Sequence, residues 1–402
     1  MIIKVAKSAA ARGINIASAL ACAIIIGKNY GAAAFSEYAF SISFINIASA
    51  ICLLGFEISI NREYYSESFN KNKKIAGLLT TIAVFVISCL AIEGYEGITN
   101  KVLTTQNLLL ATLISLITFY LSNIIKYEKS AYVYEFIRGG GINTACFLLL
   151  LLRPISSSEI ESHLLVLYSA LAIFLVCLIA LYPSKKESNS KKKSSITSFI
   201  TSSISLSFAA IASSIIISGD LILSKIFLPQ ESYETMALLS RISFFLAIPF
   251  VLLNNNQSVE ITKLKGGWPL PKRIVTNFGL ATILCTAMLL LSETYLGLFS
   301  SSNISEIQNK IIVAMLIAHA ANISSAGLVP YLACTKKAYL NTAVAASLLY
   351  FAFFYAFINK AIDEPPELKF SLALYSTLFI LKISIITLSL LAHRKVNHDI
   401  HR

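Results

Sequence analysis

Long apolar stretches divide this chain, and Lys and Arg residues concentrate in every second gap between them. Each stretch is about 16–23 residues long, which is what a helix needs to cross ~30 Å of hydrocarbon. If both termini lie on one side, the gaps on that side hold 24 of the 33 Lys and Arg residues, and the opposite gaps hold 7. The positive-inside rule therefore predicts that both termini are cytoplasmic. The twelve predicted spans are residues 8–26, 38–60, 75–92, 105–125, 137–152, 163–182, 199–219, 236–254, 274–292, 311–331, 338–358 and 370–392.

The composition excludes several other classes of protein. With 56% hydrophobic and 13% charged residues, the chain is too apolar for a soluble domain, so we predict an all-α, multi-pass membrane protein. The net charge of +12 follows the topology and forms no single patch, so no nucleic-acid partner is expected. The seven cysteines form no CxxC pair, which argues against a metal site or a disulfide framework.

Motifs of catalysis are also missing from the sequence, which contains no G-x-S-x-G elbow, Walker A loop or H-E-x-x-H. We therefore expect no enzyme and no cofactor. Without ATP hydrolysis, any work has to come from the membrane potential, the substrate's own gradient, or a coupling ion such as H⁺ or Na⁺.

The most polar internal stretch, residues 184–195, predicts a cytoplasmic linker between two six-helix bundles at residues 1–183 and 196–402. Since each half has an even number of spans, the bundles would have the same orientation in the membrane. Gly139, Gly140 and Gly141 at the start of the fifth span predict either a close helix crossing or a hinge. Pro249 and Pro330 lie inside spans, where each can kink its helix.

Cationic residues at membrane depth are the candidate substrate-binding groups, because a charge there costs about 2.5–3.5 kcal/mol and usually faces a cavity or a partner. Arg241 lies inside the eighth span and Lys382 near the middle of the twelfth. Arg12 and Arg62 lie near the inner ends of the first two spans, where they could instead reach lipid headgroups. Arginine binds phosphate oxygens through its two-pronged guanidinium and lysine acts as a point charge, so these residues suit an anionic substrate. The alternative is that they are paired structural charges.

Four further ionisable residues are candidates for ion coupling. Asp220 lies at the outer end of the seventh span, Glu57 near the inner end of the second, Glu37 at the outer start of the second, and His319 inside the tenth. A carboxylate or imidazole at such a depth can carry a proton or a sodium ion. A carboxylate at a span boundary can equally be solvated and have no role in coupling.

Several short stretches carry a resemblance to a known family: Gly27 and Gly31, residues 35–40, Leu54–Glu57, Arg62–Tyr64, Gly219–Lys225 and the segment from Arg241 to Pro249. In these the chain resembles bacterial polysaccharide exporters of the multidrug/oligosaccharidyl-lipid/polysaccharide (MOP) superfamily, especially O-antigen flippases of the Wzx type. Topology agrees along the whole chain, whereas residue-level likeness is loose outside the first quarter and residues 205–265.

The resemblance implies two six-helix bundles in a V, similar to multidrug and toxic compound extrusion (MATE) transporters, around a cationic cavity. It implies a flippase that moves an undecaprenyl-diphosphate-linked oligosaccharide to the outer leaflet of the bacterial inner membrane by alternating access. Arg241 and Arg12 would line the cavity. Membrane lipid, a polysaccharide polymerase and a chain-length regulator are the implied partners. Nothing corresponds to the additional C-terminal helices of the longer lipid II flippases.

Two other classes remain open. The nearest is a MATE-type drug/cation antiporter of the same superfamily. A membrane polysaccharide polymerase or acyltransferase is a more distant alternative. A polymerase usually has large outer loops, whereas every outer gap here is short, and an acyltransferase needs a reactive base for which His319 has no evident partner in the sequence.

Overall fold

The computed structural model describes most of the chain as helix, and no strand occurs among the described residues. The described residues are 2–56, 59–60, 69–99, 104–128, 131–138, 140–152, 161–181, 195–201, 203–204, 207, 220–264, 269–297, 305–335, 337–361 and 363–400. Within them, seven helices are long and apolar enough to cross a membrane, or eight if one bent pair counts as a span. The prediction of an all-α, polytopic membrane protein is confirmed.

The chain divides into two compact units, Met1–Ser214 and Ile215–Arg402. We call them the N-terminal and the C-terminal unit. The predicted linker at residues 184–195 lies outside the described residues except for Ser195, so its structure stays a prediction.

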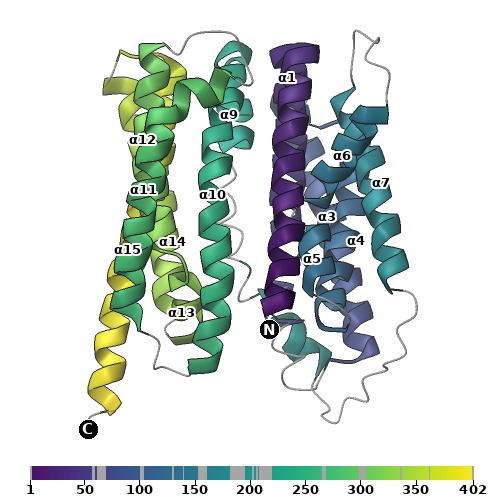
Figure 1. Ribbon diagram of the computed structural model, residues 1–402, viewed down its shortest axis with the longest axis vertical. Helices are drawn as coiled ribbons and strands as arrows, with labels where there is room; N and C mark the ends of the chain where they lie inside the picture. Colours follow the sequence, from purple (N-terminus) through teal and green to yellow (C-terminus); the bar gives the residue numbers. More distant parts are fainter. Residues whose placement is uncertain are drawn as a thin grey trace. The chain divides into compact units, whose positions relative to one another are not determined.

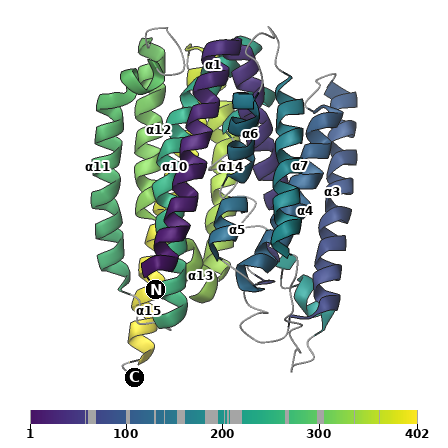
Figure 2. The same ribbon diagram turned by 45° about the vertical axis from the view of Figure 1, so that its right-hand side comes forward.

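The N-terminal unit is a bundle in which α4 and α1 contact most of the other helices. Its helices are α1 (Ile2–Cys52), α3 (Lys71–Thr99), α4 (Gln106–Glu128), α5 (Ala131–Arg138), α6 (Gly141–Leu152) and α7 (Ser162–Leu181). Figures 1 and 2 both show α1 beside α5 and α6, the two halves of the fifth predicted span. The apolar face of α3, with Leu79, Ile87 and Leu90, is exposed, which is what a surface in contact with lipid requires.

α1 contains the first two predicted spans, joined without a loop. The junction is Gly31, whose φ of 87° is a backbone conformation that favours glycine. The helix ends at Cys52 in a turn that also uses left-handed backbone, at Leu54 (φ 44°) and Gly55 (φ 70°). The second span is therefore shorter as regular helix than the apolar run in the sequence suggests.

The fifth predicted span is broken in the middle. α5 and α6 meet at a bend of 66°, and Gly140 at the break has φ 130°. A Cβ on Gly140 would lie 3.2 Å from Cβ of Asn15, and one on Gly141 would lie 3.0 Å from the carbonyl oxygen of Phe136. The sequence predicted either a bend or close packing at the glycine run. Gly140 and Gly141 provide both.

The C-terminal unit is a second helical bundle. Its helices are α9 (Asp220–Phe227), α10 (Gln230–Leu264), α11 (Leu270–Gly297), α12 (Glu306–Ser324), α13 (Leu328–Thr335), α14 (Lys337–Ala361) and α15 (Pro366–Ile400). α15 packs against α12 and α14, and α12 also packs against α10 and α11. α11 exposes Val275, Ile283 and Leu290, again as a lipid-facing surface requires.

The tenth predicted span is also broken, between α12 and α13. The chain turns at residues 325–327, where Gly327 has φ 79° and its N–H donates to Oδ1 of Asn254 on α10 (3.1 Å). Pro330 follows one turn later and lacks a backbone donor, so the turn lies where a continuous helix would be weakest. Pro249, by contrast, lies within α10, which continues through it.

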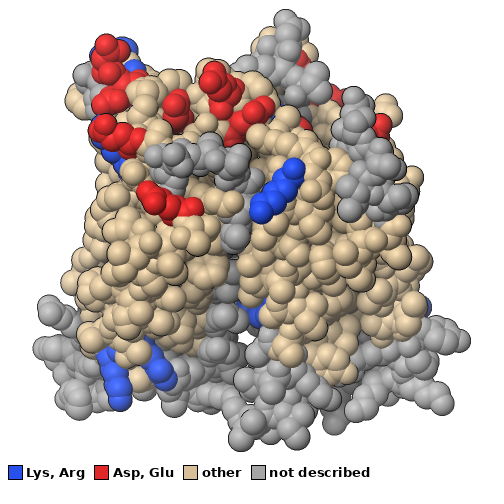
Figure 3. Space-filling view, turned by 45° about the horizontal axis from the view of Figure 1, so that its top comes forward, with Lys and Arg blue, Asp and Glu red and all other residues tan. Residues whose placement is uncertain are grey.

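Charged side chains on the face shown in Figure 3 gather toward the ends of the helices, and the surface between them is largely free of Lys, Arg, Asp and Glu. Such a band is the expected surface of a protein whose middle lies in hydrocarbon.

Candidate functional site

A group of polar side chains lies inside the C-terminal unit, between helices that come from separate parts of the chain. We call it the C-terminal polar cluster; it consists of Asp220 on α9, Arg241 and Ser243 on α10, His319 and Asn322 on α12, and Tyr375 and Lys382 on α15. All except Arg241 are buried, and His319, Asn322 and Lys382 are fully so. Polar groups inside a membrane protein are costly unless they are paired or functional, so this cluster is the main candidate site.

Helical periodicity explains why these residues converge. His319 and Asn322 are three residues apart and Tyr375 and Lys382 are seven apart, so each pair shares one face of its helix. α12 and α15 pack on each other, and α9 contacts both α10 and α15. Asp220 is the first residue of α9, where its Oδ1 accepts from the backbone N–H of Leu221 (3.0 Å). A carboxylate is stabilised at this end of a helix.

Ser243 is the centre of the cluster. Its Oγ lies 2.8 Å from Nε2 of His319. The same hydroxyl is near enough to the Asp220 carboxylate and the Tyr375 hydroxyl to interact with both, although the Tyr375 hydroxyl has no hydrogen-bond partner in the described part of the chain. Ser243 therefore joins α10 to α12 and lies near polar groups of α9 and α15.

Arg241 lies two residues before Ser243 and is only partly buried. Its guanidinium is close enough to Asp220 for electrostatic attraction, and its backbone carbonyl accepts from the hydroxyl of Tyr295 on α11 (3.2 Å). Arg241 is thus the cation of the cluster that reaches toward the protein surface.

Lys382 is the most unusual member. Its Nζ lies 4.7 Å from the centre of the Phe250 ring, a cation–π distance, and forms no hydrogen bond with the described residues. Nδ1 of His319 and both amide atoms of Asn322 are likewise without a hydrogen-bond partner in the described part of the chain. His319 is the electrostatic neighbour of Lys382. Unpaired buried polar atoms of this kind are rare in folded proteins, and a bound water or ion, strain or a functional role can each explain them.

In the N-terminal unit, Arg12 forms an ion pair with Glu135. Its Nε lies 2.6 Å and its Nη2 2.5 Å from Oε2 of Glu135 on α5. One turn later, Nδ2 of Asn15 donates to the carbonyl oxygens of Glu135 (3.3 Å) and Phe136 (3.0 Å), and Oδ1 accepts from Thr144 on α6 (2.8 Å). Arg12 and Asn15 therefore hold the two halves of the broken fifth span together. The structure favours the alternative in which Arg12 is a paired structural charge.

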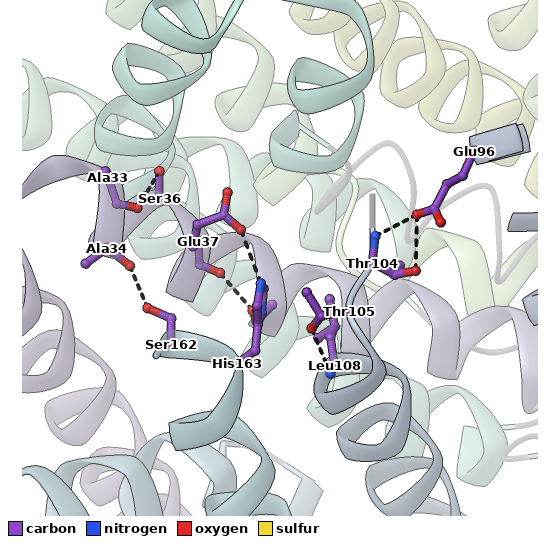
Figure 4. A network of polar contacts seen from close by, with 11 residues as sticks. Ala33, Ala34, Ser36, Glu37, Glu96, Thr104, Thr105, Leu108, Ser162 and His163 are labelled. Carbon is purple, nitrogen blue, oxygen red and sulfur yellow. Dashed lines mark hydrogen bonds and ion pairs between the residues drawn. The ribbon is translucent and has the colours of Figure 1, made fainter. Parts of the chain in front are cut away.

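Glu37 lies just after the Gly31 break in α1 and faces the start of α7 (Figure 4). Its Oε2 is 3.5 Å from Nε2 of His163, and the other ring nitrogen of His163 is 2.8 Å from the Ser41 hydroxyl. Ser162 adds a hydrogen bond to the carbonyl of Ala34 (3.0 Å). Glu37 thus joins two helices of its unit, which is compatible with either a structural or an ion-binding role.

The remaining predicted site residues, Arg62 and Glu57, lie outside the described residues. Among the residues that the structure does describe, no group of three or more His, Cys, Asp or Glu side chains could hold a metal ion.

Sequence reasoning missed Ser243, Asn322, Tyr375 and Glu135. Neutral side chains give little signal in an apolar helix, although Tyr375 is two turns from Lys382 and Asn322 one turn from His319. Those spacings would have marked both as neighbours on a polar face. Glu135 was overlooked because it precedes the apolar run that defined the fifth span.

Comparison with known proteins gives a likeness in fold only. No family model and no curated protein matches the sequence. Among solved structures, the chain is similar to an inward-facing multidrug-resistance MATE transporter of the MOP superfamily, with a TM-score of 0.65, 10% identity and 96% of each chain covered. It is also similar to a MATE protein in complex with MaL6, with a TM-score of 0.59, 11% identity, and 96% of this chain and 97% of that chain covered. A mutant of the Vibrio cholerae MATE transporter VcmN gives a TM-score of 0.51 at 12% identity, with 98% of each chain covered. The chain has the MATE transporter fold, and these neighbours are transporters rather than enzymes.

Proposed function

We propose that this protein is a flippase that moves an undecaprenyl-diphosphate-linked oligosaccharide, the repeat unit of O-antigen or a related surface polysaccharide, between the leaflets of the bacterial inner membrane. Transport would run outward, by alternating access. The observation that carries the proposal is the C-terminal polar cluster within a MATE transporter fold, where Arg241 and Lys382 outnumber the single carboxylate, Asp220.

Arg241 is the residue best suited to the diphosphate head group. It is partly exposed, whereas Lys382 is fully buried, so the guanidinium is the cationic group that a substrate can reach in this conformation. A guanidinium binds phosphate oxygens in pairs, and a site at membrane depth strengthens the attraction. The lipid tail can stay in hydrocarbon while the head group follows a polar path.

The test is a leaflet assay in proteoliposomes with undecaprenyl diphosphate carrying a fluorescent sugar, scored by dithionite quenching. We expect Arg241→Ala to lower the rate roughly tenfold or more, Arg241→Lys to lower it less, and Lys310→Ala to leave it unchanged. Lys310 is a matched control because it is an exposed cation paired with Glu306 at the end of α12. No translocation above protein-free vesicles would sink the proposal.

The second candidate is a MATE-type antiporter of cationic drugs. The fold favours it equally, and Asp220 supplies a buried carboxylate that could bind a cation. Efflux of a cationic dye in exchange for H⁺ or Na⁺, with no movement of the lipid probe, would select it.

The proposed location and orientation place both termini in the cytoplasm, with a polymerase and a chain-length regulator as partners on the product side. A single cysteine introduced at Lys310 in a cysteine-free background should react with an impermeant maleimide from outside intact spheroplasts. Labelling only after lysis would reverse the orientation.

A further inference from the structure

Two side chains that commonly bind metals face each other where α1 contacts α7, in the N-terminal unit (Figure 4). Nε2 of His163, the second residue of α7, lies 3.5 Å from Oε2 of Glu37 on α1. The His163 side chain is 21% exposed and the Glu37 side chain 32%, so an ion and its water ligands can reach both. An imidazole nitrogen and a carboxylate oxygen are ligands that suit Zn²⁺.

The hydrogen bonds of Ser41 determine which nitrogen of His163 has the free lone pair. Ser41 Oγ donates to the carbonyl oxygen of Glu37 (2.8 Å) and also lies 2.8 Å from Nδ1 of His163. A hydroxyl has only one hydrogen, so Oγ accepts from Nδ1–H. The lone pair of the neutral ring is then on Nε2, the nitrogen that faces the Glu37 carboxylate. Histidines that bind metals have a supporting hydrogen bond of this kind on the other ring nitrogen.

The distance between the two ligand atoms suits a shared metal ion. A hydrogen bond between a charged imidazole N–H and a carboxylate is about 2.7–2.9 Å long, which is shorter than the 3.5 Å found here. Zn–N bonds of about 2.0–2.1 Å and Zn–O bonds of about 2.0–2.2 Å, at a tetrahedral angle, place the two ligand atoms about 3.3–3.5 Å apart. The separation of Nε2 and Oε2 lies at the upper end of that range. A cation between them also removes the repulsion of a lone pair that faces a carboxylate.

Contacts on both sides hold the two ligands in place. Ser162, the residue before His163, donates to the carbonyl oxygen of Ala34, one turn before Glu37 (3.0 Å). Ser41 lies one turn after Glu37 and is fully buried, so it holds the imidazole from the interior of the unit. Because these supports are present without the metal, little further ordering is needed when an ion binds.

We propose that Glu37 and His163 bind a divalent transition-metal ion of the Zn²⁺ class, with water completing its coordination. The ion joins the part of α1 that follows Gly31 to the start of α7. Among the described residues no group of three or more His, Cys, Asp or Glu forms a site, so this pair binds metal more weakly than four protein ligands would. Mg²⁺ and Ca²⁺ prefer oxygen ligands and bind less well here. The inference does not rest on the proposed function.

The test is titration of the purified full-length protein with Zn²⁺ in competition with a fluorescent zinc indicator. The C-terminal tail contains three further histidines, so every protein tested has His393, His398 and His401 replaced by Gln and carries no histidine tag. We call the form with only these changes the background protein. It should bind one Zn²⁺ per chain, and its thermal unfolding temperature should rise in Zn²⁺ but not in Mg²⁺. Absence of Zn²⁺ binding, or an equal rise in Mg²⁺, would overturn the proposal.

Variants of the ligands locate the ion. Ser41→Ala removes the support of the ring and should lower Zn²⁺ affinity roughly 10- to 100-fold, and His163→Gln and Glu37→Gln should each lower it further. The matched control is Glu96→Gln, which should bind Zn²⁺ as the background protein does. Glu96 is a carboxylate near the same end of the unit, and its Oε1 accepts from the backbone N–H (2.8 Å) and the hydroxyl (3.2 Å) of Thr104. Unchanged affinity in His163→Gln would mean that Zn²⁺ binds elsewhere, and the proposal would be wrong.

Glu37→His distinguishes a metal ligand from a partner in an ion pair. Two histidines still offer two nitrogen ligands to Zn²⁺, whereas they have no opposite charges to pair. We expect this variant to bind Zn²⁺ within roughly tenfold of the background protein and to be stabilised by it against thermal unfolding. A loss of binding as complete as in Glu37→Gln would show that the carboxylate acts through its charge alone, which overturns the proposal. Zn²⁺ binding as expected, with no translocation in the lipid assay, would reject the proposed function and leave the metal site standing.

Discussion

Replacing Asn15 by Leu should destabilise the N-terminal unit, because this side chain of α1 bonds to both halves of the broken fifth span. Asn15 is 1% exposed, and its amide makes three hydrogen bonds: to the carbonyls of Phe136 (3.0 Å) and Glu135 (3.3 Å), and from Thr144 (2.8 Å). The two carbonyls belong to the last turn of α5, and the last four carbonyls of a helix have no partner within that helix. Leu fills a similar volume and leaves all three partners unpaired.

The expected cost is about 2–4 kcal/mol. A buried group that loses its partner costs about 1–3 kcal/mol, while hydrogen bonds between membrane helices average only ~0.6 kcal/mol in double-mutant cycles. The 3.3 Å bond from Asn15 to the Glu135 carbonyl contributes least to this cost. Unfolding by sodium dodecyl sulfate in dodecylmaltoside micelles, followed by circular dichroism, measures the change in the free energy of unfolding.

The control is Ser122→Ala, which removes a buried hydroxyl whose one partner among the described residues lies in its own helix, the carbonyl oxygen of Phe119 (2.8 Å). Its cost should stay near ~0.5 kcal/mol. A double-mutant cycle of Asn15→Leu with Thr144→Val should show coupling of about 1 kcal/mol. If Asn15→Leu cost no more than Ser122→Ala, the broken span would not depend on this amide, and the reasoning would be refuted.

Three further changes test other parts of the structure by the same unfolding measurement. Gly140→Ala should cost about 1–3 kcal/mol, because φ is 130° and the new Cβ would lie 3.2 Å from the side chain of Asn15; a neutral result would mean the break relaxes freely. Arg12→Met and Glu135→Gln should each cost about 2–3 kcal/mol, because each single change leaves one partly buried charge without its partner. The double variant should cost less than the sum of the two, and strict additivity would contradict the ion pair. Ser305→Ala should cost about 1 kcal/mol by removing the capping box with Gln308, and Ser305→Asp, which can still cap, should restore most of it.

Helix content and membrane character could be predicted because they depend on the length and mean hydropathy of whole segments. Breaks in the helices could not be placed with the same certainty. The glycine run at residues 139–141 signals a bend, but the 66° angle between α5 and α6 depends on Asn15 and Arg12, which are more than a hundred residues away in sequence. The α12–α13 break likewise depends on Asn254 as well as on Gly327.

The candidate site was predicted in part for a similar reason. Charged residues such as Arg241, Lys382, Asp220 and His319 stand out in an apolar helix, so the sequence identifies them one by one. It does not show that they converge, because that depends on which helix faces pack together. Ser243, which contacts His319 on α12 from α10, is one of many serines in the chain.

Protonation of Asp220 and substrate affinity are expected to be linked, because Arg241 is close enough to Asp220 for electrostatic attraction. When Asp220 is ionised, its carboxylate partly neutralises Arg241. When Asp220 is protonated, Arg241 faces an uncharged acid and attracts a diphosphate more strongly. By thermodynamic reciprocity, a bound diphosphate then favours the proton on Asp220 to the same extent. Asp220→Asn fixes the uncharged state, so it should tighten binding of the lipid diphosphate and remove the dependence of that binding on pH. An affinity that is unchanged, or that still varies with pH as in the wild type, would show that proton and substrate do not communicate through this pair.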